Sequence, residues 1–171
     1  TACSGTTPIQ YTTFGTAPAV PLQFQHAMTA IRFKIGDRLS GSHHITKIEI
    51  INAMSKGKFT LPSSVQTTTG ASFNSAWSDV STPATFTLDD INVSTAGHVN
   101  ETIVGKDGDS FTFYMIPQSA AGIKVKVYFD NQASPAIVAP FAGTWKAGTT
   151  KTYALSQSAN NLKYTFEATP N

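Results

Sequence analysis

The sequence predicts an all-β fold, a β-sandwich of about seven to ten strands in a single domain over residues 1–171. Three observations support this class. Apolar and polar residues alternate with a period of two in several segments, clusters of Gly, Pro, Ser and Asn separate those segments, and helical spacing is poor throughout. Parallel βαβ units would need helical patterns between the strands, and the sequence lacks such patterns.

The best strand candidates are segments with regular alternation. Ile31–Ile35, Ile123–Phe129 and Leu162–Phe166 are apolar at every second residue, so one face of each is expected to be buried. Phe111–Ile116 and Ile45–Ile51 carry apolar residues in both phases, and we expect both of their faces to be partly covered. The shorter candidates are Lys58–Leu61, Thr85–Leu88, Thr102–Val104, Ile137–Val138 and Lys151–Leu155, and the polar stretches Pro62–Thr82 and Gly143–Thr150 are predicted to be loops.

The alternation changes phase before the Ile31 segment. The apolar phase is even at Leu22, Phe24, His26 and Met28 and odd at Ile31, Phe33 and Ile35. Because a slip of one residue turns every side chain to the other face, the two segments cannot form one regular strand. We therefore predict a strand break or short helical turn at Ala27–Ala30, with His26 buried and hydrogen-bonded on the strand before it.

Composition and charge exclude several classes of protein. Only 13% of the residues are charged and the net charge is +2, with the basic residues spread thinly along the chain. Nucleic-acid binding is not predicted, because no basic patch is visible. Cys3 is the single cysteine, so no intrachain disulfide forms. No apolar run approaches the length that spans a bilayer.

The search for reactive groups finds no catalytic residue, cofactor site or metal site, and we expect a non-enzymatic role. His43-His44 has no third ligand at a matching spacing and fits a polar turn. Asp107-Gly108-Asp109 opens like a calcium loop but no closing glutamate follows, so a tight turn is expected. A hydrolase with carboxylates distant in sequence remains an alternative. Trp77 and Trp145 either pack within the sandwich or form a sugar-stacking surface, which would require exposed, coplanar indoles.

Four segments carry motifs in a recognisable order. Leu22–Ile35 has the pattern apolar-x-Phe-x-His-Ala followed by Ile-x-Phe-x-Ile, which includes Phe24, His26 and Phe33. Ile48–Phe59 matches the strand pair that follows it, and Phe113–Gln118 has the pattern aromatic-Met-Ile-Pro-Gln through Met115, Pro117 and Gln118. Trp145–Gly148, leading to Tyr153, has the pattern Trp-x-Ala-Gly … Tyr. Together these motifs resemble the fimbrillin family, which supplies pilus subunits and related surface lipoproteins in Bacteroidales.

The resemblance implies a transthyretin-like, Greek-key β-sandwich that is exported to the cell surface, at the outer membrane or in a fimbrium. The resemblance also implies structural roles for the motif residues and no cofactor. It further implies assembly with other fimbrial subunits by strand exchange, after a protease removes an N-terminal strand. No arginine precedes Arg32, so that cut would lie upstream of Thr1. We expect this sequence to be the N-terminal domain of a longer precursor, with the family's lipid anchor, first strand and second domain outside it.

Two functional hypotheses follow from these features. The first is a structural subunit or stalk domain of a fimbria-like assembly, supported by the ordered motifs. The second is an adhesin or glycan-binding surface module, with a host protein or glycan as its ligand, because the same fold hosts both roles.

Overall fold

The computed structural model describes residues 25–37, 39, 43–61, 73–104, 111–130, 133–135 and 137–156, and the backbone of residues 163–168. Within these ranges the chain forms eleven strands and no helix. The strands are β1 (Thr29–Ile35), β2 (His44–Phe59), β3 (Trp77–Leu88), β4 (Val93–Ser94), β5 (Phe113–Met115), β6 (Gln118–Ser119), β7 (Lys124–Phe129), β8 (Ile137–Pro140), β9 (Thr144–Trp145), β10 (Thr150–Leu155) and β11 (Lys163–Ala168). The count exceeds the predicted seven to ten because β4, β6 and β9 are only two residues long.

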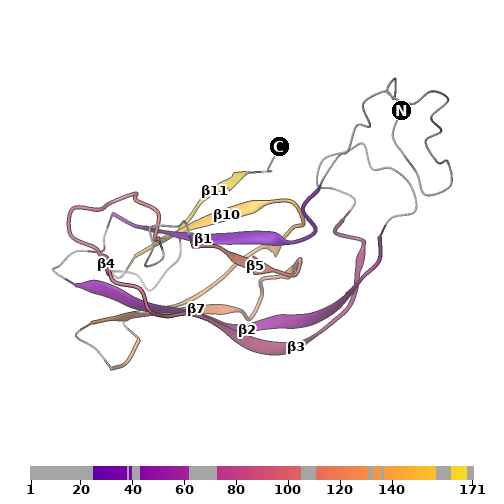
Figure 1. The fold of residues 1–171 in the computed structure, drawn as a ribbon, viewed down its shortest axis with the longest axis horizontal. Coiled ribbons are helices and arrows are strands. Elements are labelled where there is room, and N and C mark those ends of the chain that lie inside the picture. The colour runs from indigo at the N-terminus through magenta and orange to yellow at the C-terminus, as the bar shows by residue number, and fades with distance from the viewer. Residues whose placement is uncertain are drawn as a thin grey trace, which may run out of the picture.

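The strands form two facing sheets, which confirms the predicted β-sandwich (Figure 1). The first sheet has the order β11-β10-β1-β5, with β1 and β10 parallel and the outer pairs antiparallel. The second sheet has the order β3-β2-β7-β8 and is antiparallel, and β4 also pairs with β2. A small two-stranded sheet joins β6 to β9.

The core fills the space between the two sheets and is rich in aromatic rings. As predicted, β1 and β7 bury alternate residues, Phe33 and Val127 among them. Phe33 lies 6.3 Å from both Phe141 and Tyr153 between ring centroids, and the Phe141–Tyr153 pair is T-shaped at 4.9 Å. Such edge-to-face pairs add about 0.5–1.5 kcal/mol each beyond the burial of their area.

Strand β2 joins two predicted strands, and both faces of its Ile45–Ile51 part are at least partly covered, as expected. Ile45, Ile48 and Ile50 are all 0% exposed although they differ in phase, because the pairing with β7 shifts register between Ile45 and Lys47. A second shift, in the pairing with β3, lies between Ile50 and Ala53, where Asn52 has a φ of 66°. These bulges bring Ile45, Ile48, Ile50 and Ala53 to the same buried face.

Two predictions from the polar stretches are wrong. Trp77–Thr82 belongs to β3 and Thr144–Trp145 forms β9, although both were predicted to be loops. The first half of β3, Trp77–Thr82, shows no alternation of apolar and polar residues, because β3 is an edge strand and most of these residues are exposed. Tyr114, in the middle of β5, is 63% exposed, so the expected partial cover of both faces is missing at this residue.

The predicted break before β1 is present, but it is not helical. The chain bends at Met28 and β1 begins at Thr29, which corrects the alternative of a short helical turn at Ala27–Ala30. Leu22 and Phe24 lie outside the described residues. His26 is exposed and outside any strand, so the prediction of a buried histidine is wrong.

Candidate functional site

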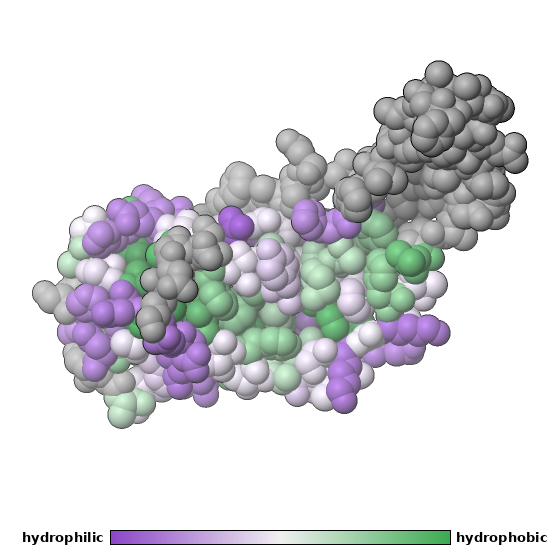
Figure 2. Space-filling model, in the orientation of Figure 1, coloured by the Kyte–Doolittle hydropathy of each residue, from purple (hydrophilic) through white to green (hydrophobic). Residues whose placement is uncertain are grey.

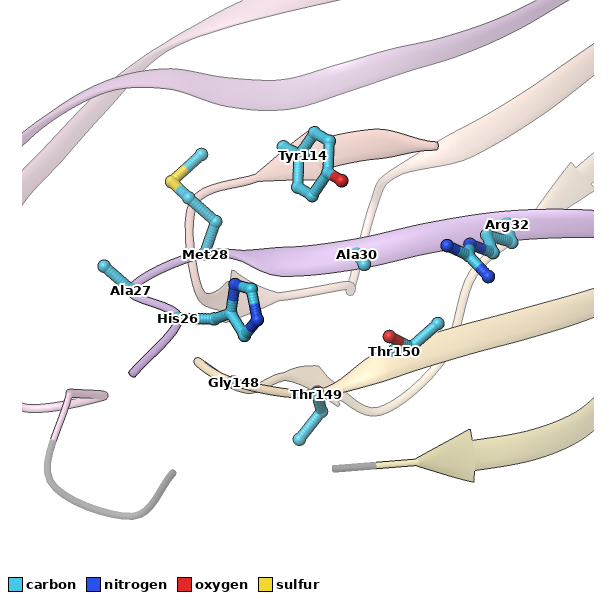
Figure 3. A pocket seen from close by; sticks show the side chains of 9 residues that line it. All are labelled: His26, Ala27, Met28, Ala30, Arg32, Tyr114, Gly148, Thr149 and Thr150. Atoms are coloured by element: carbon cyan, nitrogen blue, oxygen red, sulfur yellow. The ribbon is translucent and has the colours of Figure 1, made fainter. Parts of the chain in front are cut away.

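A pocket of about 260 Å³ opens on the outer face of the first sheet, where β1 and β10 begin (Figure 3). It is lined by two cationic or titratable groups, three hydroxyl side chains and four small or apolar residues. These residues are His26, Ala27, Met28, Ala30, Arg32, Tyr114, Gly148, Thr149 and Thr150.

Strand register creates the floor of this pocket. Ala30 lies opposite Tyr114 of β5 on one side and opposite Thr150 of β10 on the other. The neighbouring Ile31 points into the core, and side chains alternate along a strand, so these three side chains share the outer face. The methyl group of Ala30 between two larger side chains leaves a hollow.

The guanidinium of Arg32 forms one end of the hollow. Arg32 is the next outward residue of β1 after Ala30, and its Nε donates a hydrogen bond of 2.9 Å to Thr112 Oγ1. The ring of His26 lies at the other end, with Ala30 between the two along β1 (Figure 3). The pocket therefore has a basic or titratable group at each end, and no carboxylate is found among the described residues that line it.

A tight turn before β10 holds the pocket wall in place. The hydroxyls of Thr29 and Thr149 both donate to the carbonyl of Lys146, each at 2.7 Å. Gly148 has a φ of 72°, a conformation that glycine adopts without steric cost, and its N–H donates to Met28 O at 3.0 Å. The motif residues His26 and Gly148 thus meet at one end of the sandwich.

The tip of the β2–β3 hairpin docks at the same end. Trp77 is half-buried, packs on Phe59 at 5.3 Å and donates its Nε1–H to Ala27 O at 2.8 Å. Asn74 Oδ1 accepts a hydrogen bond of 2.7 Å from the backbone N–H of Ala147. The long hairpin is therefore anchored to the segments on either side of the pocket.

Trp145 does not contribute to a surface. Its side chain is 0% exposed, it contacts Phe141 at 5.3 Å, and its Nε1 donates to the Tyr153 hydroxyl at 3.1 Å. The proposed stacking surface formed by Trp77 and Trp145 is therefore wrong, because one indole lies in the core and the other is tethered at the hairpin tip.

The other motif residues lie in the interior or bind the backbone. Phe33 and Met115 are 2% and 1% exposed, and Pro117 is buried. The amide of Gln118 contacts the backbone of Met54. The sequence did not indicate that Arg32 and Tyr114 are neighbours. They lie close together because β1 pairs with β5, a strand about eighty residues later in the chain.

Away from the pocket, Asp130 lies beside two histidines on the surface. His44 donates its backbone N–H to Asp130 Oδ1 at 3.3 Å, and the two side chains are also 3.3 Å apart. The backbone donor, followed by the His44 side chain and the nearby His43, lowers the pKa of Asp130. Among the described residues, no three His, Cys, Asp or Glu side chains are placed to hold a metal ion. The Asp107–Asp109 segment lies outside these residues.

The second sheet carries a polar group of its own on the outer face. The Tyr128 hydroxyl donates to Glu49 Oε2 at 2.9 Å, and Lys47 Nζ lies 3.9 Å from the centre of the Tyr128 ring. Partial burial and this bond to Glu49 raise the pKa of Tyr128.

In the part of the chain that is described, no helix is long and apolar enough to cross a membrane.

Two solved structures are similar to this chain. A protein of Bacteroides uniformis, provisionally assigned to cell adhesion, shares 17% identity at a TM-score of 0.50, over 90% of this chain and 55% of its own. A similarly assigned protein of Bacteroides ovatus shares 12% identity at a TM-score of 0.44, over 84% of this chain and 44% of its own. The chain thus spans about half the length of these structures.

Low identity limits the first of these likenesses to the fold. No curated protein matches the chain. A family model described as fimbrillin-like matches residues 12–170, which is nearly the whole chain and confirms the resemblance seen in the motifs. The chain therefore belongs to the fimbrillin-like family of fimbria-related surface proteins.

Proposed function

We propose that this protein is a structural subunit or stalk domain of a fimbria-like assembly, exported to the cell surface, that docks with neighbouring subunits by β-strand complementation. Its role is structural and not catalytic. Family membership supports the assembly, and the outer edge of β5, which pairs with no other described strand, supports the mode of docking.

The backbone of Tyr114 faces this open edge. Ala30 N donates to Thr149 O at 2.9 Å, so the peptide groups of Ala30 point toward β10 and those of Ile31 point toward β5. Tyr114 lies opposite Ala30 and therefore occupies a non-hydrogen-bonded position of the antiparallel pair. Its N–H and C=O point away from β1, where an added strand would bind them.

Apolar side chains accompany this edge. Phe111, Phe86 and Val93 are partly buried and pack against the core. Phe111 leads into β5 of the first sheet, whereas Phe86 and Val93 lie on β3 and β4 at one edge of the second sheet. Apolar surface is visible between the two layers in Figure 2. An added strand would cover this surface with alternate side chains.

The edge strand β3 is poorly suited to the same role. It contains Pro83, which has no N–H, and both Asp79 and Thr82 have positive φ values, 52° and 62°. Proline and irregular backbone are devices that keep edge strands from pairing. The contrast with β5 favours docking at the β5 edge.

A proline at the open edge tests this proposal. Tyr114→Pro removes the outward N–H without removing a hydrogen bond to β1, and proline is tolerated at such positions. Tyr114→Thr is the matched control, because it loses the ring but keeps the N–H. The full-length protein is treated with an arginine-specific protease and run unheated on a denaturing gel beside an untreated sample.

We expect a protease-dependent ladder for the wild type and for Tyr114→Thr, with collapse on boiling, and loss of the ladder for Tyr114→Pro. A single monomer band for the wild type would contradict the subunit function. A ladder that persists in Tyr114→Pro would instead exclude β5 as the docking edge.

A further inference from the structure

We propose that the pocket on the outer face of the first sheet is a binding site for an acidic sugar, in which Arg32 binds the carboxylate and Tyr114 contacts the sugar ring. The pocket uses the side chain of Tyr114, whereas docking uses its outward backbone, and sugar binding does not depend on assembly. It gives the protein a ligand in addition to its structural role.

The charge of the pocket selects an anion. Among the described residues, Arg32 has one recorded hydrogen bond, from its Nε to Thr112 Oγ1. The two Nη groups remain as parallel donors, and a guanidinium presents such donors in the geometry that binds both oxygens of a carboxylate. None of the described residues that line the pocket is acidic, so none of them competes for these donors.

The size of the pocket suits one sugar unit. Neighbouring strands are about 4.8 Å apart, so Tyr114 and Thr150, two strand spacings apart across Ala30, define a trough on the order of 10 Å wide. The volume of about 260 Å³ falls just below the range of about 300–1,000 Å³ found for drug-sized ligands. A single six-membered ring with one charged substituent suits these dimensions.

The remaining lining groups suit the other parts of a sugar. Tyr114 is 63% exposed and offers an aromatic face together with a hydroxyl. Thr150 lies across the pocket from Tyr114, and the His26 ring closes the end opposite Arg32 (Figure 3). Thr149 Oγ1 already donates to Lys146 O, so toward a ligand it acts as an acceptor for a sugar hydroxyl.

Titration calorimetry of the purified chain tests the site. The probes are glucuronic acid, galacturonic acid and N-acetylneuraminic acid, with glucose as the neutral comparison and acetate as a carboxylate without a ring. We expect at least one acidic sugar to bind at least tenfold more tightly than glucose and than acetate, because both the charge and the ring contribute.

Variants locate the binding. Arg32→Gln is expected to weaken binding at least tenfold, and Arg32→Lys at least threefold, because lysine keeps the charge but not the paired donors. Ala30→Leu fills the floor without changing charge and should abolish binding. Lys58→Gln, an exposed change of charge on β2, is the control and should leave binding within twofold. Thermal unfolding of each variant confirms that the fold is intact.

Several results would overturn the proposal. These are the failure of all three acidic sugars to bind, equal binding of glucose or acetate, or wild-type affinity in a folded Ala30→Leu or Arg32→Gln variant. Arg32→Gln separates this site from assembly, because we expect it to polymerise normally while its sugar binding is weakened. Tyr114→Thr should bind acidic sugars at least threefold more weakly, because it loses the aromatic ring.

Discussion

The side chain of Gln118 pairs with the peptide group of Met54 in the manner of a neighbouring strand. Met54 N donates to Gln118 Oε1 at 2.8 Å, and Gln118 Nε2 donates to Met54 O at 3.3 Å and to Ile116 O at 3.0 Å. The pairing of β2 with β7 stops at Ile51, so the amide satisfies backbone groups beyond the end of β7. This motif residue therefore serves the fold.

Gln118→Leu is expected to lower the free energy of unfolding by about 1–3 kcal/mol, because the peptide group of Met54 loses its partner in a partly buried position. Urea denaturation measures this loss. Lys124→Gln, an exposed substitution at the start of β7, is the control and should stay within about 0.5 kcal/mol of the wild type. Equal stabilities of the two variants would contradict the structural role of Gln118.

Trp145→Phe is expected to lower the free energy of unfolding by about 1–3 kcal/mol, because it removes the hydrogen bond to Tyr153 and leaves a cavity in the core. The affinity for acidic sugars should not change, since Trp145 does not line the pocket. Chemical denaturation and calorimetry on one sample measure both. Loss of sugar binding with unchanged stability would restore a ligand-contact role for Trp145.

Gly36→Ala is expected to destabilise the protein by about 2 kcal/mol or more, because the added Cβ would collide with the carbonyl oxygen of Leu155. The N–H of Gly36 donates to this same oxygen at 2.9 Å, which holds the ends of β1 and β10 together.

Gly97→Ala is the control, because Gly97 has a φ of 80° but no atom near the added Cβ. Its cost should be about 1 kcal/mol, from backbone strain alone. A thermal unfolding series gives the order of the two effects. A smaller loss for Gly36→Ala than for Gly97→Ala would show that β1 and β10 move apart easily.

Asp130 is expected to make stability depend on pH in the acid range. Its pKa is lowered by the backbone N–H of His44, then by the His44 side chain and by His43, from an ordinary value of 3.8. A group whose pKa falls on folding stabilises the protein above the unfolded pKa and loses that contribution as the pH falls through the folded pKa. The difference in urea midpoint between wild type and Asp130→Asn should therefore shrink to zero on acidification.

His44→Gln provides the control for this effect. The backbone N–H that donates to Asp130 remains in this variant, so most of the acid dependence should remain as well. Loss of the whole dependence in His44→Gln would mean that the imidazole, and not the backbone, stabilises the carboxylate.

Alternation of residues predicted the inner faces of β1 and β7 correctly, because each of these strands has one buried face along its whole length. Alternation did not predict the buried faces of β2 and of the first half of β3, Trp77–Thr82. In β2 the bulges near Lys47 and Asn52 reset the phase, and in β3 the edge position leaves few buried residues to form a pattern. A period of two is informative only where the pairing is regular and one face is covered.

The sequence by itself determined the all-β class, the family and the core strands, since these depend on local alternation and on motifs in order. The tertiary structure decided that Trp145 lies in the core, that His26 is exposed, and that Tyr114, Ala30 and Thr150 form one row across three strands. The physical reason is that a pocket on a sheet depends on the register between strands far apart in the chain. That register is set by packing of the whole sandwich and has no local pattern.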